Sequence, residues 1–260
     1  GYSAGPVVLL ASLTGKATML LEQNAVPGMT NRLLASFVRA AAVSYEDTAI
    51  FFGDKAFVSG NPVRKGFFGK SDFQLNKSRR PHVLVVGGSQ GAHAINEAMV
   101  AAVPMIAQVS GGVEITHQTG VADVDMVREA YCRAGIDAQV ECFFDLMDKE
   151  MHVADLVVCR AGATTLAEVA AAGRPSLVVP FPHAAYDHQR SNAKAMVDAG
   201  SAELIDETDL SACFANRLLD LIADRERLQT MSQAAFRLAR PNAAERIVER
   251  VTELLDLSTS

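Results

Sequence analysis

The sequence predicts an α/β protein with a doubly wound parallel sheet over most of its length. Two observations carry this prediction: apolar, β-branched runs alternate with stretches of helical spacing from residue 83 onward, and the first run ends in a glycine pair. Strands that are continuous apolar runs are typical of a parallel sheet that helices cover on both faces. Right-handed crossovers between such strands give a Rossmann-like domain.

The individual elements follow from these patterns in chain order. Apolar runs predict strands over residues 83–86, 113–116, 138–143, 156–159, 176–180 and 202–205. Helical spacing predicts helices over residues 92–107, 123–134, 145–152, 166–172, 188–199 and 210–223. Pro241 then breaks the chain, and residues 243–255 are expected to form a terminal amphipathic helix.

Residues 1–69 alternate in the same way but less completely, and they amount to about half of a second α/β unit. The pattern predicts an apolar run at 7–13, a strand at 17–21, an apolar-faced helix at 31–42, and short extended pieces at 50–51 and 56–58. Residues 70–81 are polar and basic without periodicity, which is typical of a linker. A complete domain at 82–241 and a tail at 242–260 follow.

The composition excludes several classes of protein. The net charge is −6, from 24 basic and 30 acidic side chains, which argues against a nucleic-acid partner held by bulk charge. The four cysteines include no C-x-x-C pair, and neither a metal-ligand cluster nor a D-x-D motif appears, so we expect no metal and no other cofactor. No apolar stretch approaches about 18 residues, so no transmembrane helix is expected.

The loop after the first predicted strand carries a glycine-rich turn, GGSQGA, at residues 87–92. In an open parallel sheet, ligands bind beyond the carboxyl ends of the strands, and a helix N-terminus there presents N–H groups to an anion. Gly88, Ser89 and Gln90 are therefore candidates for phosphate binding, although a simple glycine-rich turn explains the same pattern. The loop is neither G-x-G-x-x-G nor Walker A, which disfavours NAD binding and ATP hydrolysis.

A second strand–loop–helix junction lies at residues 159–168. Gly162 permits a tight turn there, and Thr164 or Thr165 can cap the helix that follows. Glu168 falls in the expected first turn of this helix, where a carboxylate can support the helix N-terminus. Alternatively, Glu168 accepts hydrogen bonds from the two vicinal hydroxyls of a ribose. The spacing alone slightly favours the cap.

Polar side chains also follow the fifth predicted strand. His188, Gln189 and Asn192 lie within about one helical turn, so they can face one side of the helix. Amides in such a cluster suit a neutral, polyhydroxylated ligand such as a sugar. After the third strand, Phe143 and Phe144 either support a flat ring or belong to the core.

The first unit adds two candidates. Asn24 follows the strand predicted at 17–21, and Arg64 follows a short extended piece before the linker. Arg64 is either a surface charge or, near a domain junction, a phosphate contact. A phosphate loop, a ribose carboxylate and an amide cluster on successive loops of one sheet together predict a site for a nucleotide-sugar donor.

Four segments together carry a resemblance to a known family. They are LLEQNAVPGMTNRLLA, GNPVR, VLVVGGSQGAHAIN and ADLVVCRAGATTLAEVAAAGRPSLVVPFPHAAYDHQRSNA. In combination they resemble the MurG-type N-acetylglucosaminyltransferases over essentially the whole chain. The resemblance implies the GT-B fold, in which two Rossmann-like domains face each other across a cleft. It implies a complete UDP-sugar-binding domain here and only the C-terminal part of the N-terminal, acceptor-side domain.

The resemblance also implies a reaction and a location. The reaction is inverting, metal-independent transfer of N-acetylglucosamine from UDP-N-acetylglucosamine to lipid I, the undecaprenyl-linked muramyl-pentapeptide, which gives lipid II for peptidoglycan. The location is the anionic inner-membrane surface on its cytoplasmic side, where the protein would be peripheral. The helix expected at 31–42 carries Arg32 and Arg39 beside apolar residues and could contact that surface, although a core-facing helix explains it as well.

The resemblance assigns individual residues as well. Ser89 would contact the donor diphosphate, the backbone of Phe144 the uracil, Glu168 the ribose hydroxyls and Gln189 the donor sugar. The full expected set for UDP-N-acetylglucosamine is Asn24, Arg64, Gly88, Ser89, Gln90, Phe144, Arg160, Ala163, Thr164, Thr165, Leu166, Ala167, Glu168, His188, Gln189 and Asn192. No catalytic base is assigned: Glu22, Asp145 and the six histidines are candidates by chemistry only.

One family motif is absent from this sequence. The family carries a glycine-rich loop followed by histidine, G-G-T-G-G-H, and no such motif occurs here. We therefore expect a fragment or a truncated relative whose donor side is nearly complete. The alternatives are a catalytically inactive module that binds a UDP-sugar, and another GT-B protein such as a glycolipid transferase or a sugar-nucleotide epimerase. The pairing of GGSQG with DHQ disfavours the last of these.

Overall fold

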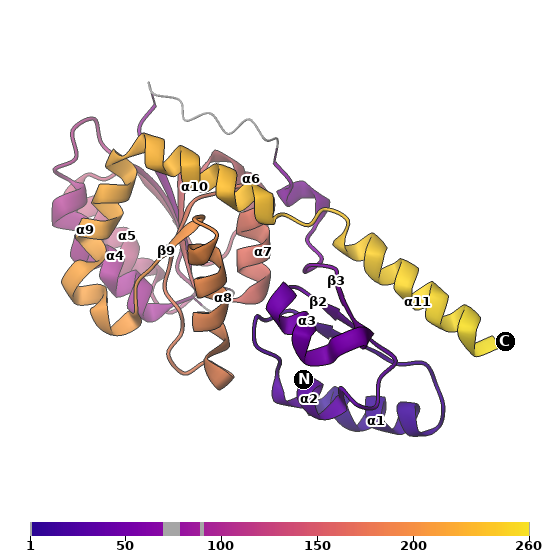
Figure 1. The fold of residues 1–260 in the computed structure, drawn as a ribbon. Coiled ribbons are helices and arrows are strands. Elements are labelled where there is room, and N and C mark those ends of the chain that lie inside the picture. The colour runs from indigo at the N-terminus through magenta and orange to yellow at the C-terminus, as the bar shows by residue number, and fades with distance from the viewer. Residues whose placement is uncertain (1, 70–78, 89–90, 260) are drawn as a thin grey trace.

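The computed structural model describes residues 2–69, 79–88 and 91–259, and it contains two parallel sheets. Figure 1 shows the sheets in two units, a smaller one near the N-terminus and a larger one that holds most of the chain. The α/β class predicted from the sequence is confirmed. The predicted linker, residues 70–81, falls mostly outside the described residues, and the domain boundaries proposed around it stay predictions.

The larger sheet has six parallel strands in the order β6-β5-β4-β7-β8-β9. The strand bounds are β4 (His82–Val86), β5 (Glu114–Gln118), β6 (Ala138–Glu141), β7 (Leu156–Cys159), β8 (Ser176–Val178) and β9 (Ala202–Leu204). The chain runs outward from β4 to β6 on one side and then returns beside β4 to continue with β7 on the other. Such a reversal of strand order opens a crevice at the carboxyl ends of the strands.

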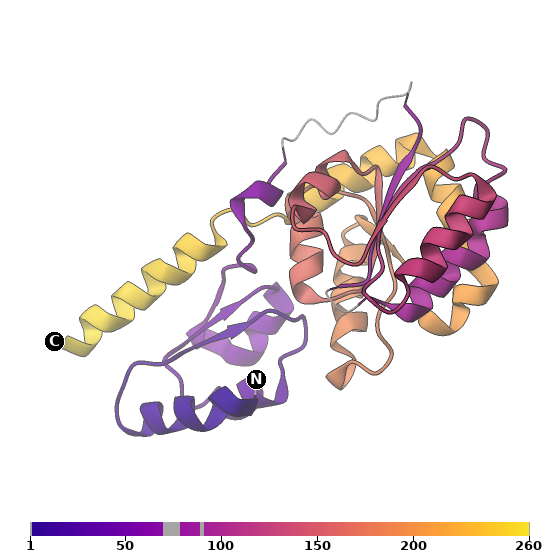
Figure 2. The same cartoon turned by 180° about the vertical axis from the view of Figure 1, so that it is seen from behind.

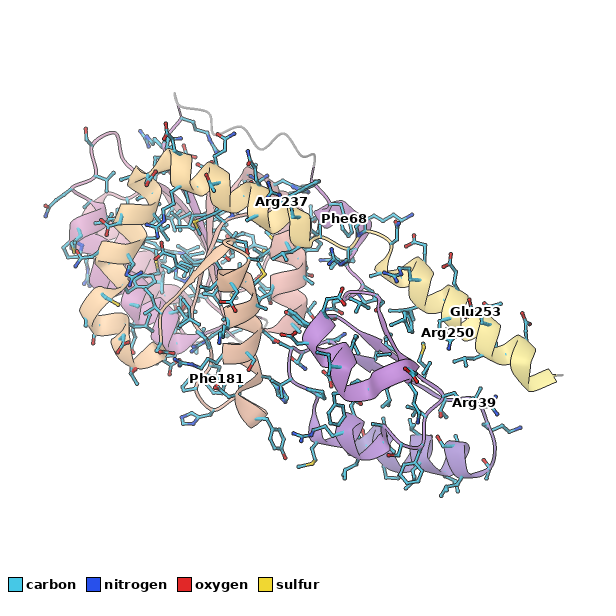
Figure 3. All side chains as sticks on the ribbon, viewed as in Figure 1. Arg39, Phe68, Phe181, Arg237, Arg250 and Glu253 are labelled. Atoms are coloured by element: carbon cyan, nitrogen blue, oxygen red, sulfur yellow. The ribbon has the colours of Figure 1, made fainter. Side chains whose placement is uncertain are left out.

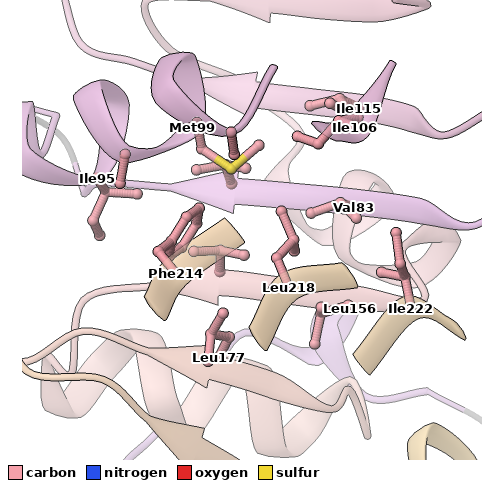
Figure 4. Packing of buried hydrophobic residues seen from close by; sticks show 14 of the residues in the cluster. Val83, Ile95, Met99, Ile106, Ile115, Leu156, Leu177, Phe214, Leu218 and Ile222 are labelled. Carbon is pink, nitrogen blue, oxygen red and sulfur yellow. The ribbon is translucent and has the colours of Figure 1, made fainter. Parts of the chain in front are cut away.

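Helices cover both faces of this sheet because its strands are apolar on both sides. Val83 and Val85 of β4 belong to one core cluster, and the intervening Leu84 and Val86 belong to the other. Figure 4 shows part of the first cluster, where side chains such as Phe214 pack against the strands. The covering helices are α4 (His93–Ile106), α5 (Val124–Ala134), α6 (Met147–Val153), α7 (Ala163–Ala171), α8 (His188–Asp198), α9 (Leu210–Ala223) and α10 (Arg225–Leu238).

The smaller unit has three parallel strands in the order β1-β2-β3. Its elements are α1 (Gly5–Leu13), β1 (Met19–Glu22), α2 (Met29–Leu34), β2 (Ala40–Val43), α3 (Glu46–Phe52) and β3 (Ala56–Val58). The helix predicted at 31–42 is wrong, because α2 ends at Leu34 and Ala40–Val43 forms the central strand. All four residues of β2 are buried, which small apolar side chains permit between two neighbouring strands. The extended piece predicted at 50–51 is also wrong, since it lies within α3.

The C-terminal helix α11 (Ala243–Thr259) leaves the larger unit and runs beside the smaller one, as two opposite views show (Figures 1 and 2). Arg246 and Arg250 of α11 share a small surface pocket with Asp54 and Phe57. Figure 3 labels Arg250 and Glu253 on this part of the helix. No helix in the described ranges is long and apolar enough to cross a membrane.

Candidate functional site

The glycine-rich loop is shaped by close backbone contacts. Gly88 and Gly91 have φ values of +89° and +81°, which residues with a Cβ rarely adopt. A Cβ on Gly91 would lie 2.0 Å from the carbonyl oxygen of Thr119, so the backbone after β5 abuts this loop directly. Helix α4 follows, and no side chain caps its first turn at Ala92. The Ile95 N–H donates to Ala92 O at 2.9 Å, so the N–H groups that an anion could use at this helix end are those that precede Ile95.

Two of the predicted phosphate contacts, Ser89 and Gln90, lie outside the described residues. Gly88, the third, lies at the carboxyl end of β4, as the sequence predicts.

Gln118, the last residue of β5, connects this loop to the loop after β6. Its Nε2 donates to the carbonyl oxygen of Gly88 at 3.0 Å, and its Oε1 accepts from the backbone N–H of Phe144 at 2.9 Å. Both Gln118 and Phe144 are buried. Gln118 is not among the site residues predicted from the sequence. The sequence signal that could have identified it is a long amide side chain at the end of a strand. That strand lies between the strands that carry the two candidate loops.

A buried polar network holds the start of α4 against β5. His117 has no exposed surface, and burial lowers its pKa to about 3, so the ring is neutral. Asn96 Nδ2 donates to Thr119 O at 2.9 Å and to Asp123 Oδ2 at 2.7 Å. Asn96 Oδ1 must then accept from His117 Nε2 at 2.9 Å, which leaves His117 Nδ1 to accept from Tyr131 at 2.9 Å.

Helix α7 begins three residues earlier than predicted, and this corrects two expectations. Its N-cap is Gly162, with no side-chain cap, so Thr164 and Thr165 lie inside the first turn. Glu168 is the sixth residue of the helix and lies too far along it to cap its N-terminus. The capping role is therefore wrong for all three side chains. The ribose contact of Glu168 stays a prediction.

Glu168 is half-buried and lies near Arg64, which comes from the segment that joins the two units. Burial raises the pKa of the Glu168 carboxyl, and the Arg64 charge opposes this shift. Arg64 itself lies over the ring of Phe67, with 5.1 Å from its guanidinium carbon to the ring centroid. The fold therefore brings together two predicted site residues that are about a hundred positions apart.

Three of the other predicted residues of α7 line a cavity toward the smaller unit. Ala163, Leu166 and Ala167 line a cavity of about 240 Å³ together with residues of the smaller unit that include Tyr45 and Asn61. Burial raises the pKa of Tyr45 to about 12, and Nδ2 of buried Asn61 has no protein hydrogen-bond partner in the described part of the chain. The cavity lies between the units.

Arg160 braces neighbouring loops of the larger unit. Its Nη1 donates to the carbonyl oxygens of Val179 and Pro180 at 3.3 and 3.2 Å, and its guanidinium forms an ion pair with Glu207. The same group lies over the ring of Phe181, 5.4 Å from its centroid. Figure 3 shows Phe181 at the end of the larger unit that faces the smaller one.

Gln189 also joins loops. Its Oε1 accepts from the backbone N–H groups of Ala161 and Phe181 at 3.2 and 3.0 Å. These bonds tie the loop after β7 to the loop after β8. The roles of Gln189 and Arg160 toward a sugar nucleotide stay predictions.

Asn192 and His188 of α8 meet the loop after β1. Asn192 is buried, its Oδ1 accepts from the Ala25 N–H at 2.8 Å, and its Nδ2 donates to Asn24 Oδ1 at 3.1 Å. His188 and Tyr186 line a cavity of about 270 Å³ with residues 21–24 and 28–31. The Nδ1 atom of His188 is buried without a protein partner among the residues described. Asn24, His188 and Asn192 therefore gather between the two units, and their contacts to a donor stay predictions.

Glu22 is one candidate for the base, but each of its carboxylate oxygens already accepts two hydrogen bonds. Its Oε1 accepts from Asn24 N and Nδ2 at 3.0 and 3.1 Å, and its Oε2 accepts from Gly28 N and Asn31 Nδ2, both at 2.8 Å. The side chain is buried. These four bonds hold the loop that carries Asn24, which indicates a structural role for Glu22.

Comparisons with known proteins agree on one family. The model of the glycosyltransferase family 28 C-terminal domain matches residues 82–247. A UDP-N-acetylglucosamine–N-acetylmuramyl-(pentapeptide) pyrophosphoryl-undecaprenol N-acetylglucosamine transferase from Nitratidesulfovibrio vulgaris (strain Miyazaki F) is 44% identical, over 98% of this chain and 72% of its own length. A transferase of the same name from Anaeromyxobacter dehalogenans (strain 2CP-C) is 42% identical, over 98% of this chain and 67% of its own length.

A solved structure shows the same relationship. The crystal structure of Acinetobacter baumannii MurG matches with a TM-score of 0.85 and 33% identity, over 97% of this chain and 72% of that one. The predicted GT-B architecture is thereby confirmed. The chain thus belongs to glycosyltransferase family 28, among the MurG-type UDP-N-acetylglucosamine–N-acetylmuramyl-(pentapeptide) pyrophosphoryl-undecaprenol N-acetylglucosamine transferases.

Proposed function

We propose that this protein transfers N-acetylglucosamine from UDP-N-acetylglucosamine to lipid I, which gives lipid II. The observation that carries the proposal is the 44% identity to a transferase of that name over 98% of the chain. The geometry supports the donor side. The glycine-rich loop and Phe144 follow the carboxyl ends of β4 and β6, where nucleotides bind in such folds, and Glu168 lies on α7, the helix that follows β7.

The proposed donor site divides into a diphosphate part and a nucleoside part. Uncapped N–H groups at the start of α4, together with Ser89, would hold the diphosphate. The backbone at Phe144 would read the uracil, and the Glu168 carboxylate would accept hydrogen bonds from the ribose hydroxyls. The sugar would then extend toward the cavity between α8 and the loop after β1, where His188 and Asn24 lie.

In the proposed reaction, the acceptor hydroxyl oxygen attacks the anomeric carbon of N-acetylglucosamine. The bond between that carbon and the phosphate oxygen breaks, and UDP leaves with the electron pair. A base takes the proton of the hydroxyl, and no residue of this chain is assigned that role. Helix N-termini stabilise the negative charge that develops on the departing diphosphate, because their N–H groups are already oriented toward it.

The acceptor is attached to a lipid, so we further propose that the protein works at the cytoplasmic face of an anionic bacterial inner membrane as a peripheral protein. The predicted membrane helix does not carry this proposal, because α2 ends at Leu34. In and just after α2, the side chains of Leu33, Phe37 and Arg32 are exposed. They are the apolar and basic groups of the predicted helix that would contact the membrane surface. Co-sedimentation that does not depend on anionic lipid would contradict the membrane proposal.

Two assays test the proposed function. Calorimetry with UDP tests the donor site, and Glu168→Gln and Ser89→Ala should each weaken the affinity that the wild type shows. Incubation of this chain with lipid I and labelled UDP-N-acetylglucosamine tests transfer through the appearance of lipid II. No UDP binding by the wild type would overturn the donor site.

A second candidate is a module that binds the sugar nucleotide without transferring the sugar. The 260 residues cover 72% of the length of the 44% identical transferase, and the G-G-T-G-G-H motif does not occur among them. Donor binding without lipid II formation would support this candidate, and turnover by this chain would exclude it. Tighter binding of another nucleotide sugar than of UDP-N-acetylglucosamine would overturn the donor assignment in both cases.

A further inference from the structure

The cavity between α7 and the smaller unit contains a buried amide that the fold leaves without a partner. The cavity has a volume of about 240 Å³, and most of its lining is apolar, with Val58, Leu166 and Met196 among the side chains. Asn61 also lines it and is only 7% exposed, and its Nδ2 has no protein partner among the residues that the structure describes. A buried polar group without a partner costs free energy, so a molecule other than the chain is expected to satisfy it.

A second polar group of the cavity comes from the same unit. Tyr45 directly precedes α3, and its side chain lines the cavity. Burial alone raises the pKa of Tyr45 to about 12, and no charged or hydrogen-bonding neighbour contributes to this shift. Its hydroxyl is therefore protonated and can donate a hydrogen bond. An apolar cavity with a few polar groups has the usual composition of a site for a small molecule.

The chain passes between the two units twice, and both passages border this cavity. The first leads from β3 through Gly60, Asn61 and Val63, and the second leads through Leu238 and Arg240 into α11. The two passages touch, because a Cβ on Gly60 would lie 2.5 Å from the Cβ and Cγ atoms of Arg240. A molecule in the cavity would therefore contact both units beside the two connections that join them.

The cavity differs from the proposed ribose contact on the same helix. Ala163 and Ala170 of α7 line it at helical spacing, whereas Glu168 is not part of its lining. The lining includes one acidic and one basic side chain, Glu46 and Arg240, which together carry no net charge. It therefore favours a neutral ligand over a nucleotide.

The size and the polar groups of the cavity define the class of ligand. An apolar cavity of about 150 Å³ holds benzene, so about 240 Å³ suits a body of two fused rings. The end of an asparagine side chain presents both a donor and an acceptor, and its complement is a group that also has both, such as a carboxamide or a lactam. The hydroxyl of Tyr45 can donate a further hydrogen bond to the carbonyl oxygen of such a group.

We propose that this cavity is a binding site for a small, neutral, largely apolar molecule with a carboxamide or lactam group, which contacts both units. Asn61 and Tyr45 are the polar residues that recognise it. Neither is a predicted nucleotide contact, so the site is additional to the proposed donor site.

Calorimetry with carbostyril, a neutral fused-ring lactam, tests this site. The wild type should bind it, and N-methylcarbostyril, whose lactam has no N–H, should bind about tenfold more weakly. Asn61→Leu removes the amide, so it should weaken carbostyril binding about tenfold and abolish the difference between the two probes. Tyr45→Phe should weaken both probes by a similar factor, because each keeps its carbonyl oxygen.

Two further variants provide a test from the larger unit and a matched control. Ala195 of α8 lines the cavity, and Ala195→Leu would occupy part of its volume, so both probes should bind about tenfold more weakly or not at all. Asn216→Leu makes the same chemical change as Asn61→Leu at an exposed position of α9 that is not part of the lining. It should leave both affinities unchanged.

Each contrary outcome is measurable. A folded wild type that does not bind carbostyril would overturn the proposal and indicate that the cavity holds only water. Equal carbostyril affinity in the wild type and Asn61→Leu, or an equal loss in Asn216→Leu, would also overturn it. Competitive displacement of carbostyril by UDP would place the probe in the donor site and contradict a separate cavity site. If Asn61→Leu does not fold, Tyr45→Phe and the comparison of the two probes in the wild type still decide the matter.

Discussion

Asn192 Nδ2 donates to Asn24 Oδ1 across the boundary between the two units, at 3.1 Å. The same nitrogen donates to Ala161 O at 3.2 Å within the larger unit, and Asn24 is itself held by Glu22 in the smaller one. A continuous chain of hydrogen bonds therefore joins the loop after β7, helix α8 and the loop after β1. These are three of the places where the sequence predicts donor contacts.

Replacing Asn192 by alanine should destabilise the protein. The change leaves the Ala25 N–H and the Ala161 carbonyl without this partner at a buried site, which typically costs about 1–3 kcal/mol. Urea denaturation measures the change in the free energy of unfolding. Lys194→Ala, at an exposed position of the same helix, is the control and should change it by less than about 0.5 kcal/mol.

The same variant tests whether Asn192 contacts the donor sugar. A sugar contact predicts that Asn192→Ala weakens binding of UDP-N-acetylglucosamine more than binding of UDP. Equal weakening of both would show that Asn192 acts through the junction between the units. An unfolding free energy equal to that of the wild type would contradict the structural role.

A methyl group on Gly91 should be poorly tolerated. Gly91→Ala places a Cβ 2.0 Å from Thr119 O at a φ of +81°, so both steric overlap and backbone strain oppose it. Together these effects should cost about 2–5 kcal/mol. Gly111→Ala is a close control, because Gly111 has a φ of +84° and nothing within 4 Å of an added Cβ. It should cost only about 1–2 kcal/mol from backbone strain.

Thermal or urea unfolding of the two glycine variants gives the comparison directly. Equal destabilisation by both substitutions would contradict the close approach of the glycine-rich loop to the end of β5. UDP affinity should fall in Gly91→Ala and remain unchanged in Gly111→Ala, since only the former distorts the proposed diphosphate loop.

Glu168→Gln should lower the affinity for UDP without lowering the free energy of unfolding. Burial raises the pKa of Glu168, so ionising this carboxyl costs the folded state free energy as the pH rises through its folded pKa. The neutral glutamine avoids this cost, and we expect an equal or higher unfolding free energy at pH 7. UDP affinity should instead fall about tenfold to a hundredfold, the range for a hydrogen bond to a charged group.

Calorimetry and denaturation at pH 7 measure both effects of Glu168→Gln. Glu249→Gln, at an exposed position in the middle of α11, removes the same charge and should leave both quantities unchanged. Loss of stability together with loss of affinity in Glu168→Gln would indicate that the carboxylate supports the fold and would contradict the ribose contact.

Strands of the larger sheet are predictable because their amino-acid composition strongly favours the extended conformation. The runs at 83–86 and 156–159 are apolar and mostly β-branched, and they form β4 and β7 within one residue of the predicted bounds. The run Ala40–Val43 is predicted wrongly because alanine favours helices, and only its position between β1 and β3 makes it a strand. Helix α10 was not predicted, although Leu228, Met231 and Ala235 repeat at helical spacing and are buried.

Candidate loops are also predictable, since any parallel sheet places its strand ends at one edge. Which side chains then bond to one another depends on contacts between residues far apart in the sequence. Asn192 and Asn24 are 168 positions apart, and no local pattern reveals their hydrogen bond. Gln118 was not predicted for the same reason, because its side chain bonds to backbone atoms of two other loops.

His117 should remain uncharged far below the pH at which histidine normally titrates. Burial lowers its pKa from 6.5 to about 3, and both ring nitrogens are engaged by Asn96 and Tyr131. Nitrogen chemical shifts of the imidazole should therefore report one neutral tautomer, protonated at Nε2, from pH 8 to about pH 4. His93 is the internal comparison: its hydrogen bond to Asp123 raises its pKa, so it should titrate above 6.5.

The low pKa of His117 makes the fold sensitive to acid. Below pH 6.5 the unfolded chain binds a proton at this residue and the folded chain does not, so the free energy of unfolding falls as the pH falls. This residue alone should contribute up to about 1.4 kcal/mol per pH unit between the unfolded and the folded pKa. His117→Gln should lower stability at pH 7 but show a shallower loss from pH 6.5 to pH 5. Parallel stability curves for the variant and the wild type, or a His117 ring that titrates near 6.5, would contradict the buried network that holds the start of α4.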